Sequence, residues 1–320
     1  MKRVAAIGEC MIELRHQDDS ALLLGYGGDT CNTAVYLARC GGQEVRVDYV
    51  TRVGDDWYSD QLVARLAAER LGTALVQRVP GRSPGLYLIR TDVTGERSFT
   101  YYRSESPARE LFTADHPDHI DAMLQSYDLV YLSAISLQIL HPQARERLWR
   151  MLAAVRRRNG RVAFDTNYRP AGWPSRDVAR AAVERTLRLT DIALPTLGDE
   201  QALFGDVDEH GVAERLATLA VREAAIKNGA HGCLVVHDGD EFLVRPAHVE
   251  RVLDTTAAGD SFNAGYLAAR LRGAPPDAAA QAGHRVAAAV IGHAGAIVPR
   301  SALTWPSLFD ATGTVDESRP

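Results

Sequence analysis

The residues with the clearest capacity for chemistry lie in the segment 254–262, which reads Asp-Thr-Thr-Ala-Ala-Gly-Asp-Ser-Phe and precedes a helical pattern. Small residues just before a helix let backbone N–H groups approach a ligand, and these groups favour an anion together with the helix dipole. Asp260 falls in the first helical turn, where that anion would meet a nucleophile. The segment could therefore serve phosphoryl transfer. The alternative is an ordinary helix start that Asp260 caps.

A second candidate segment, 27–34, reads Gly-Gly-Asp-Thr-Cys-Asn-Thr-Ala and leads into another helix. Paired glycines expose backbone N–H groups, and Asp29 and Asn32 could hydrogen-bond the hydroxyls of a polyol. The alternative is a strand–turn–helix connection in which Asp29 or Thr30 caps the helix. Neither G-x-x-x-x-G-K-[ST] nor G-x-G-x-x-G after a strand occurs in the sequence, so a P-loop or a dinucleotide fold is not expected.

The elements that must position these segments alternate between strands and helices. Strands are expected at 4–8, 45–50, 128–132, 161–165, 191–194, 224–227, 233–237 and 241–244, and helices at 30–40, 57–71, 141–158, 176–189, 259–271 and 276–293. Strands separated by helices of ten or more residues predict βαβ units and a parallel sheet. The strand-like segments 22–28, 86–91 and 98–103, the last two around a turn at 94–96, break this rhythm and predict a small β element beside the α/β body.

Composition limits the class of protein. The chain has 320 residues, 46% apolar and 24% charged, which is typical of a globular protein of one or two domains. A net charge of −5 argues against nucleic acid or an anionic membrane as the main partner. Four cysteines without C-x-x-C spacing, and the lack of a long apolar stretch, favour a cytoplasmic protein with neither a disulfide framework nor a membrane span. The polar end of the chain, 312–320, is expected to fray.

The two candidate segments together resemble the two signatures of the ribokinase-like (PfkB) sugar kinases. The matching positions are Gly27, Gly28, Asn32, Ala34 and Gly41 in the first signature, and Asp254, Thr255, Ala258, Gly259 and Asp260 in the second. The chain departs from the pattern at Ala257, where the family usually has glycine. Within the family, Ala-Ala-Gly-Asp is similar to the 2-dehydro-3-deoxygluconate kinases, as are Gly85-Leu86-Tyr87, Tyr101-Tyr102-Arg103 and the run 165–170.

The resemblance covers nearly the whole chain and implies a fold and an activity. The expected fold is a single domain, 1–320, of three α/β/α layers with a mainly parallel central sheet. A small β-sheet lid would be drawn from about 9–30 and 82–104. The implied reaction is ATP-dependent phosphorylation of a sugar acid, 2-dehydro-3-deoxy-D-gluconate, at its 6-hydroxyl. The alternatives are a fructokinase- or ribokinase-type kinase of a neutral sugar, and a non-catalytic sugar-binding regulator, against which Asp260 argues.

The resemblance also implies roles for residues around the sugar. Asp260 would be the catalytic base, and Ala257, Ala258 and Gly259 would form the anion hole for the γ-phosphate. Residues expected to contact the sugar are Gly28, Asp29 and Asn32, with Tyr87 and Tyr102 on the lid. Because a buried carboxylate needs a fixed cationic partner, Arg103 and Arg169 are expected to bind the carboxylate of a sugar acid.

The nucleotide and metal positions are also implied by the resemblance. The expected ATP contacts are Asn167, Thr196, Lys227, Gly229, Gly232 and His284. Asp199 falls where the family has a glutamate that holds Mg²⁺ through water, with Glu200 as the alternative. Whether a monovalent cation such as K⁺ binds beside the anion hole is left open. Whether the chain forms a homodimer through the lid is left open as well.

Overall fold

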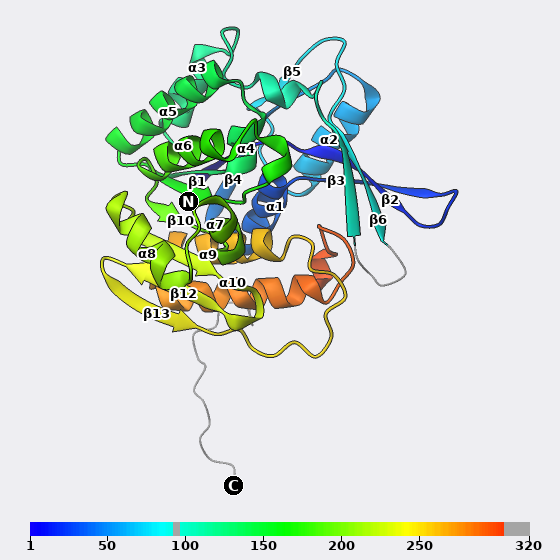
Figure 1. Ribbon diagram of the computed structural model, residues 1–320. Coiled ribbons are helices and arrows are strands. Elements are labelled where there is room, and N and C mark those ends of the chain that lie inside the picture. Colours follow the sequence, from blue (N-terminus) through cyan, green and yellow to red (C-terminus); the bar gives the residue numbers. More distant parts are fainter. Residues whose placement is uncertain (92–96, 304–320) are drawn as a thin grey trace.

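The structure is a computed structural model that describes residues 1–91 and 97–303. A nine-stranded sheet runs through the molecule in the order β13-β12-β11-β10-β9-β8-β1-β4-β5 (Figure 1). All neighbours from β11 to β5 are parallel, whereas β12 and β13 extend the sheet as an antiparallel pair. Its strands are β1 (Lys2–Ile7), β4 (Val45–Val53), β5 (Val76–Arg78), β8 (Leu129–Ser133), β9 (Arg161–Asp165), β10 (Ile192–Ala193), β11 (Glu223–Lys227), β12 (Cys233–His237) and β13 (Asp240–Val244).

Helices cover both faces of this sheet and complete three layers (Figure 1). On one face lie α1 (Asp29–Gly41), α2 (Trp57–Ala68), α9 (Ala258–Leu271) and α10 (Pro276–Ile291). On the other face lie α3 (Asp118–Leu124), α4 (Ala134–Ile139), α5 (Pro142–Arg157), α6 (Arg176–Leu187), α7 (Leu197–Leu203) and α8 (Glu209–Thr218). Each face has its own buried apolar cluster. The predicted three-layer α/β/α fold with a mainly parallel sheet is therefore confirmed.

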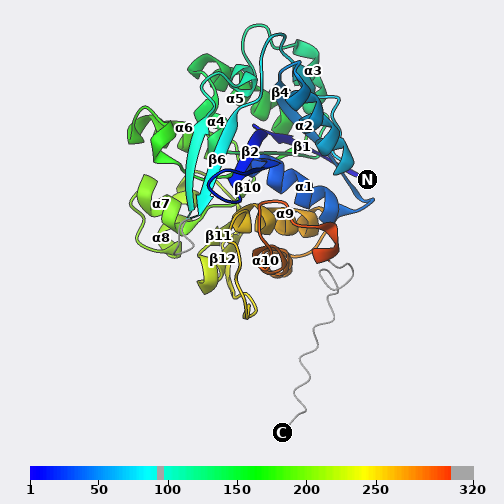
Figure 2. The same cartoon turned by 90° about the vertical axis from the view of Figure 1, so that its right-hand side faces the viewer.

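A separate four-stranded sheet, which we call the lid sheet, stands beside the main body (Figure 2). Its order is β3-β2-β6-β7, with β2 (Met11–His16), β3 (Leu22–Gly27), β6 (Leu86–Thr91) and β7 (Arg97–Tyr102). Strands β6 and β7 pair antiparallel, as the sequence predicts. The predicted turn at 94–96 and the polar end at 312–320 lie outside the described residues.

The sequence patterns did not predict the strands β2 and β5 or the helices α3, α4, α7 and α8. Met11-Ile12-Glu13-Leu14 is nearly continuous in apolar character, so it lacks the alternation that marks a half-buried strand. Helices α4 and α7 have only 6 and 7 residues, too few for a helical period to be visible. Among the described residues, no helix has both the length and the apolar character needed to cross a bilayer.

Candidate active site

Most of the predicted site residues line a cavity of about 1020 Å³ between the lid sheet and the main sheet. Parallel strands place their carboxyl ends at one edge, where ligands bind in open α/β sheets. Asp165 and Lys227 are the last residues of β9 and β11, and both line the cavity. The other predicted residues in its wall are Gly28, Asp29, Asn32, Tyr87, Arg103, Asn167, Arg169, Thr196, Asp199, Ala257, Ala258, Gly259 and Asp260.

Asp260 and Asp29 are each held by a side-chain amide. Asn32 donates from Nδ2 to Asp260 Oδ2 at 2.9 Å, and Asn167 donates from Nδ2 to Asp29 Oδ2 at 2.9 Å. Burial and the neighbouring Asp29 carboxylate raise the pKa of Asp260 well above its usual value, although the Asn32 bond opposes this. A carboxylate with a raised pKa accepts a proton more readily, as a general base requires.

The start of α9 forms the predicted anion hole. Ala257 precedes the helix with φ 59° and ψ 16°, a left-handed conformation in which alanine is strained and glycine is not. The Ala258 N–H donates to Thr255 O at 3.1 Å. The first-turn N–H groups of Gly259 and Asp260 have no backbone carbonyl partner within residues 1–91 and 97–303. Asp254 braces this turn, because its carboxylate accepts from the backbone N–H groups of Thr256 and Gly295.

Arg103 is ion-paired with Glu9 at the base of the lid sheet. Glu9 is only 3% exposed and lines the cavity together with Arg103. A Cβ at Gly85 would lie 2.6 Å from Glu9 Oε1, so glycine is needed for the lid strand to approach this pair. The pairing uses Arg103 Nη2, while Arg103 Nε is buried and has no hydrogen-bond partner among the described residues, so it could donate to a ligand.

Arg169 lines the cavity and is ion-paired with Asp199. Its Nη1 donates to Asp199 Oδ1 at 3.1 Å and to Tyr168 O at 2.8 Å. Burial raises the pKa of Asp199 despite the nearby Arg169 charge. Glu200 points elsewhere: it is fully buried, pairs with Arg215 and accepts a bond from the Thr166 hydroxyl. Of the two proposed metal carboxylates, only Asp199 faces the cavity.

The lid sheet corrects one predicted contact. Tyr102 is 62% exposed and does not line the cavity, whereas Tyr101 and Phe99 do. Alternate residues of a strand point to opposite faces, so the prediction chose the wrong one of two adjacent tyrosines. Tyr101 lies against Tyr87 with ring centroids 5.8 Å apart, and the Tyr87 hydroxyl donates to Glu13 at 2.6 Å.

Three predicted nucleotide residues lie outside this cavity. Gly229 and Gly232 belong to the loop 228–232 after β11 and have positive φ angles of 52° and 112°. A Cβ at Gly232 would meet Val244 O at 2.5 Å, so close packing against β13 already requires glycine there. His284, on α10, donates from Nε2 to Val244 O at 3.1 Å and lies edge-on to Phe262.

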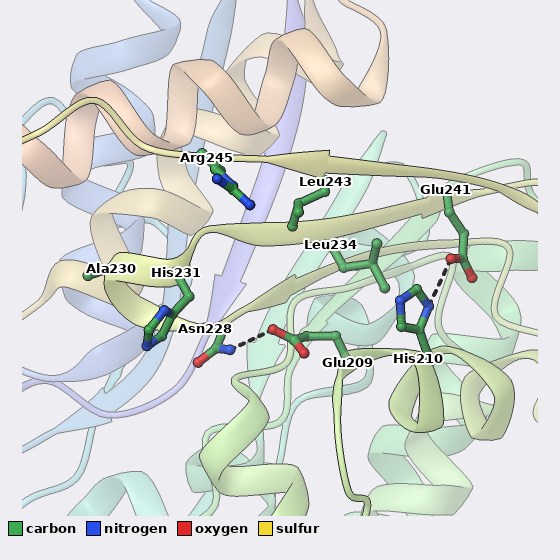
Figure 3. Close-up of a pocket in the computed structure, with 9 residues that line it drawn as sticks. All are labelled: Glu209, His210, Asn228, Ala230, His231, Leu234, Glu241, Leu243 and Arg245. Atoms are coloured by element: carbon green, nitrogen blue, oxygen red, sulfur yellow. Dashed lines mark hydrogen bonds and ion pairs between the residues drawn. The ribbon is translucent and has the colours of Figure 1, made fainter.

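On its α8 side the same loop borders a second cavity of about 710 Å³ (Figure 3). Asn228 donates to Glu209 at 2.5 Å and so ties the loop to the first turn of α8. Beside it, His210 Nδ1 lies 3.0 Å from a carboxylate oxygen of Glu241, a contact between α8 and β13. The first contact ties the loop 228–232 to α8, and the second ties β13 to α8.

Sequence reasoning assigned no role to Glu9, Tyr101, Asp165 or Asn263. The first three line the cavity, and Asn263 lies directly behind it on α9. Asp165 could have been found from its position at the end of a predicted strand, because the carboxyl edge collects functional side chains. Asn263 gives no such signal, since a polar residue inside a helix usually faces solvent.

Comparison with known proteins agrees with this geometry. Residues 1–303 match the pfkB family carbohydrate kinases. The chain belongs to this family. Curated relatives include the 2-dehydro-3-deoxygluconokinases of Dickeya dadantii (strain 3937), 45% identical over 94% of this chain and 98% of the relative, and of Escherichia coli (strain K12), 44% identical over 94% and 99%. The fructokinase of Vibrio alginolyticus is 26% identical over 84% of each chain.

Solved structures of pfkB kinases share the fold. A PfkB protein from Polaromonas sp. JS666 superposes with a TM-score of 0.82 at 23% identity, covering 94% of this chain and 98% of that one. Fructokinase from Xylella fastidiosa with bound ATP gives 0.81 at 22% identity, with 94% of each chain covered. A fructokinase double mutant from Vibrio cholerae O395, bound to fructose, ADP and potassium ion, gives 0.79 at 23% identity, with 94% and 95% covered.

Proposed function

We propose that this pfkB kinase phosphorylates the 6-hydroxyl of 2-dehydro-3-deoxy-D-gluconate with ATP. The observation that carries the proposal is one cavity that joins Asp260 to two arginines, Arg103 and Arg169. An anionic sugar fits this arrangement better than a neutral one, because arginine offers a planar fork to a carboxylate. Identity of 44–45% to curated 2-dehydro-3-deoxygluconokinases, against 26% to a fructokinase, supports the same choice.

Polar groups that line the cavity can hydrogen-bond the hydroxyls of the sugar. Asn32 Oδ1 is buried, and the described residues offer it no hydrogen-bond partner. An unsatisfied buried acceptor costs about 1–3 kcal/mol, so a hydroxyl donor from the sugar would be favoured there. Asp29 and the backbone at Gly28 complete this side, and Tyr87 and Tyr101 cover the sugar from the lid sheet.

The proposed reaction gives each of these groups a role. Asp260 accepts the proton of the 6-hydroxyl while its oxygen forms a bond to the γ-phosphorus, and the bond from that phosphorus to the β–γ bridging oxygen breaks to release ADP. The N–H groups at the start of α9 hold the negative charge of the transferring phosphoryl. The lid sheet limits the entry of water, which would otherwise compete for the phosphoryl group.

The acidic residues of the cavity fit Mg²⁺ held mainly through phosphates and water. No cluster of three or more His, Cys, Asp or Glu within residues 1–91 and 97–303 is arranged to bind a metal ion. Asp199 is the proposed water-mediated contact, and such a sparse protein site is usual for Mg²⁺. When bound, Mg²⁺ offsets charge on the β- and γ-phosphates. Asn167, Thr196, Lys227 and the loop 228–232 are the proposed nucleotide contacts, with His284 beside the adenine.

The test is a coupled ADP-release assay with Mg-ATP and either 2-dehydro-3-deoxy-D-gluconate, fructose, ribose or no sugar. We expect turnover of the sugar acid alone and loss of turnover in Asp260→Ala. Arg103→Leu and Arg169→Leu should each raise KM for the acid, whereas Arg157→Leu, an exposed change on α5, should not. Turnover of fructose or ribose instead would overturn the carboxylate assignment but keep the base.

Two accessory features belong to the proposal. A K⁺ requirement, suggested by the potassium-bound fructokinase, is tested by replacing K⁺ with Na⁺ or tetramethylammonium in the assay. A homodimer through the lid is supported by the exposed edge strand β3, where Leu22, Leu23 and Leu24 are 39–43% exposed. Light scattering of Leu23→Lys against wild type tests the dimer. Use of ATP and four free cysteines favour the cytoplasm as the site of action.

A further inference from the structure

An ammonium group, that of Lys227, lies close to the anion hole. Lys227 ends β11, is 7% exposed and lines the catalytic cavity. A Cβ built on Gly259, in the first turn of α9, would lie 3.9 Å from Lys227 Nζ. The amine therefore stands beside the backbone donors that are proposed to hold the transferring phosphoryl group.

Two buried side chains fix this amine. Nζ donates to Asn263 Oδ1 at 2.8 Å and lies 3.5 Å from Asp165 Oδ1. Asn263 Nδ2 in turn donates to Asp165 Oδ2 at 2.7 Å, which closes a ring of three residues from β11, α9 and β9. Asn263 also donates to the Tyr131 hydroxyl at 3.3 Å, so its amide has a defined orientation.

This arrangement leaves part of the ammonium unused. An ammonium has three N–H donors. Within the part of the chain that the structure describes, Nζ bonds to Asn263 and Asp165. One donor is thus left over on a group that already lies on the cavity wall. Leaving a buried cation with an unmade bond is costly unless a ligand completes it.

The composition supports a specific need for lysine at this position. Lysine occurs only twice in the chain, at 2 and 227, while 34 of the 36 basic residues are arginine. Lys2 is exposed on the first strand. A compact point charge on a narrow stem can enter the space behind Gly259 where a planar guanidinium would need more room.

We propose that Lys227 is a catalytic residue whose free N–H contacts the transferring γ-phosphoryl oxygen, with Asn263 and Asp165 as positioning residues. The inference rests on the proposed kinase function and adds to it a charged donor beside the neutral backbone N–H groups. Charge spreads over the phosphoryl oxygens in a loose transition state, so a fixed cation there lowers the barrier. Lys227 forms no covalent bond in this step.

The γ-phosphate distinguishes this role from the alternatives. ADP lacks the γ-phosphate, whereas the β,γ-imido analogue of ATP retains it. A lysine that contacts the γ-phosphate affects binding of the analogue and not of ADP. A lysine that contacts the α- or β-phosphate affects both, and a merely structural ion pair affects neither.

The first experiment measures calorimetric affinities of ADP and of the imido analogue, each with Mg²⁺, for wild type, Lys227→Met and the control Lys2→Met. We expect Lys227→Met to bind the analogue at least tenfold more weakly and to bind ADP as wild type does. Its kcat should fall about 10²–10³-fold with KM for the sugar acid unchanged. Asn263→Ala should lower kcat less, with the same split between the analogue and ADP, because Asp165 still holds the amine.

The second experiment needs no change at the site. With lysine ¹³C-labelled at Cε, the protein gives two lysine side-chain signals, and Lys2→Arg assigns them. The Lys227 signal should move on adding the imido analogue and stay in place with ADP. The inference would be overturned if Lys227→Met lost affinity equally for both nucleotides or for neither. It would also be overturned if the Lys227 signal shifted equally with both nucleotides or with neither. A wild type that binds no nucleotide would instead overturn the proposed kinase function.

Discussion

Asn32 donates a hydrogen bond to Asp260 across 2.9 Å, although the two residues are 228 positions apart in the chain. The amide stands in the first part of α1 and the carboxylate in the first turn of α9, and these two helices pack against each other. The bond thus connects the segment proposed to bind the sugar to the segment proposed to bind the phosphoryl group.

This bond predicts a change in pH dependence. The hydrogen bond from Asn32 lowers the pKa of Asp260, against the larger effect of burial. In Asn32→Leu that pKa should rise further, so the carboxyl stays protonated to higher pH and the acidic limb of kcat/KM moves upward. The control is Asn167→Leu, whose amide binds Asp29 instead. An acidic limb that moves equally in both variants would contradict a specific role for Asn32.

Alternate side chains of strand β7 point to opposite faces, so mutations of the two adjacent tyrosines should have different effects on KM for the sugar. Tyr101 faces the cavity and stacks with Phe99 at 6.3 Å, whereas Tyr102 faces away. Tyr101→Ala should raise KM for the sugar about tenfold, the worth of one good aromatic contact. Tyr102→Ala should leave KM within about twofold. Steady-state kinetics of both variants checks this, and the reverse order of effects would refute the assignment of faces.

The Glu9–Arg103 pair predicts that removing a charge strengthens substrate binding. Glu9→Gln keeps a hydrogen-bond acceptor but leaves the Arg103 charge without its carboxylate partner. The unliganded protein should lose stability, and the sugar acid should bind about fivefold or more tightly because it now supplies the missing anion. Thermal unfolding of the unliganded protein measures the loss of stability, and steady-state kinetics measure KM for the sugar acid. A KM that is unchanged or higher would show that the substrate carboxylate does not reach Arg103.

Ala257 predicts a gain in stability on replacement by glycine. Its left-handed φ of 59° costs alanine about 1–2 kcal/mol relative to glycine. The greater freedom of glycine in the unfolded chain offsets about 0.4–1 kcal/mol of this. Ala257→Gly should therefore raise the free energy of unfolding by about 0.5–1 kcal/mol in urea titrations. The neighbouring change Ala258→Gly, inside the right-handed helix, should lower the same quantity.

Glu200 predicts a dependence of stability on pH. Burial raises its pKa from 4.5 to about 7, although Arg215 lowers it. Because the folded pKa exceeds the unfolded one, the stabilisation is complete below pH 4.5 and is lost as pH rises toward 7. In the wild type the free energy of unfolding should fall by about 3 kcal/mol between pH 4.5 and 7.5 because of this group, and in Glu200→Gln this fall should be absent. Chemical unfolding across that range measures the decline, with Glu214→Gln, a change at an exposed residue of α8, as the control. An unchanged slope in Glu200→Gln would contradict the raised pKa.

The sequence by itself determined the alternation of strands and helices, the separate β element and the base at the start of α9. These features depend on local causes. Apolar periodicity fixes which segments can bury one face, and small residues before a helix expose its N–H groups wherever the chain folds. The same local information placed Asp260, Asn32 and Lys227 in segments that the structure brings to one cavity.

The tertiary structure decided which side chain of each pair faces that cavity and which groups share it. Tyr101 and Tyr102 differ only in strand phase, and Asp199 and Glu200 lie about 100° apart around α7, so packing alone selects between them. Arg103 pairs with Glu9, which is 94 positions away in the sequence, and Asn263 is hydrogen-bonded to Asp165, which is 98 positions away. No local pattern encodes such pairs, because they exist only after separate strands and helices have packed together.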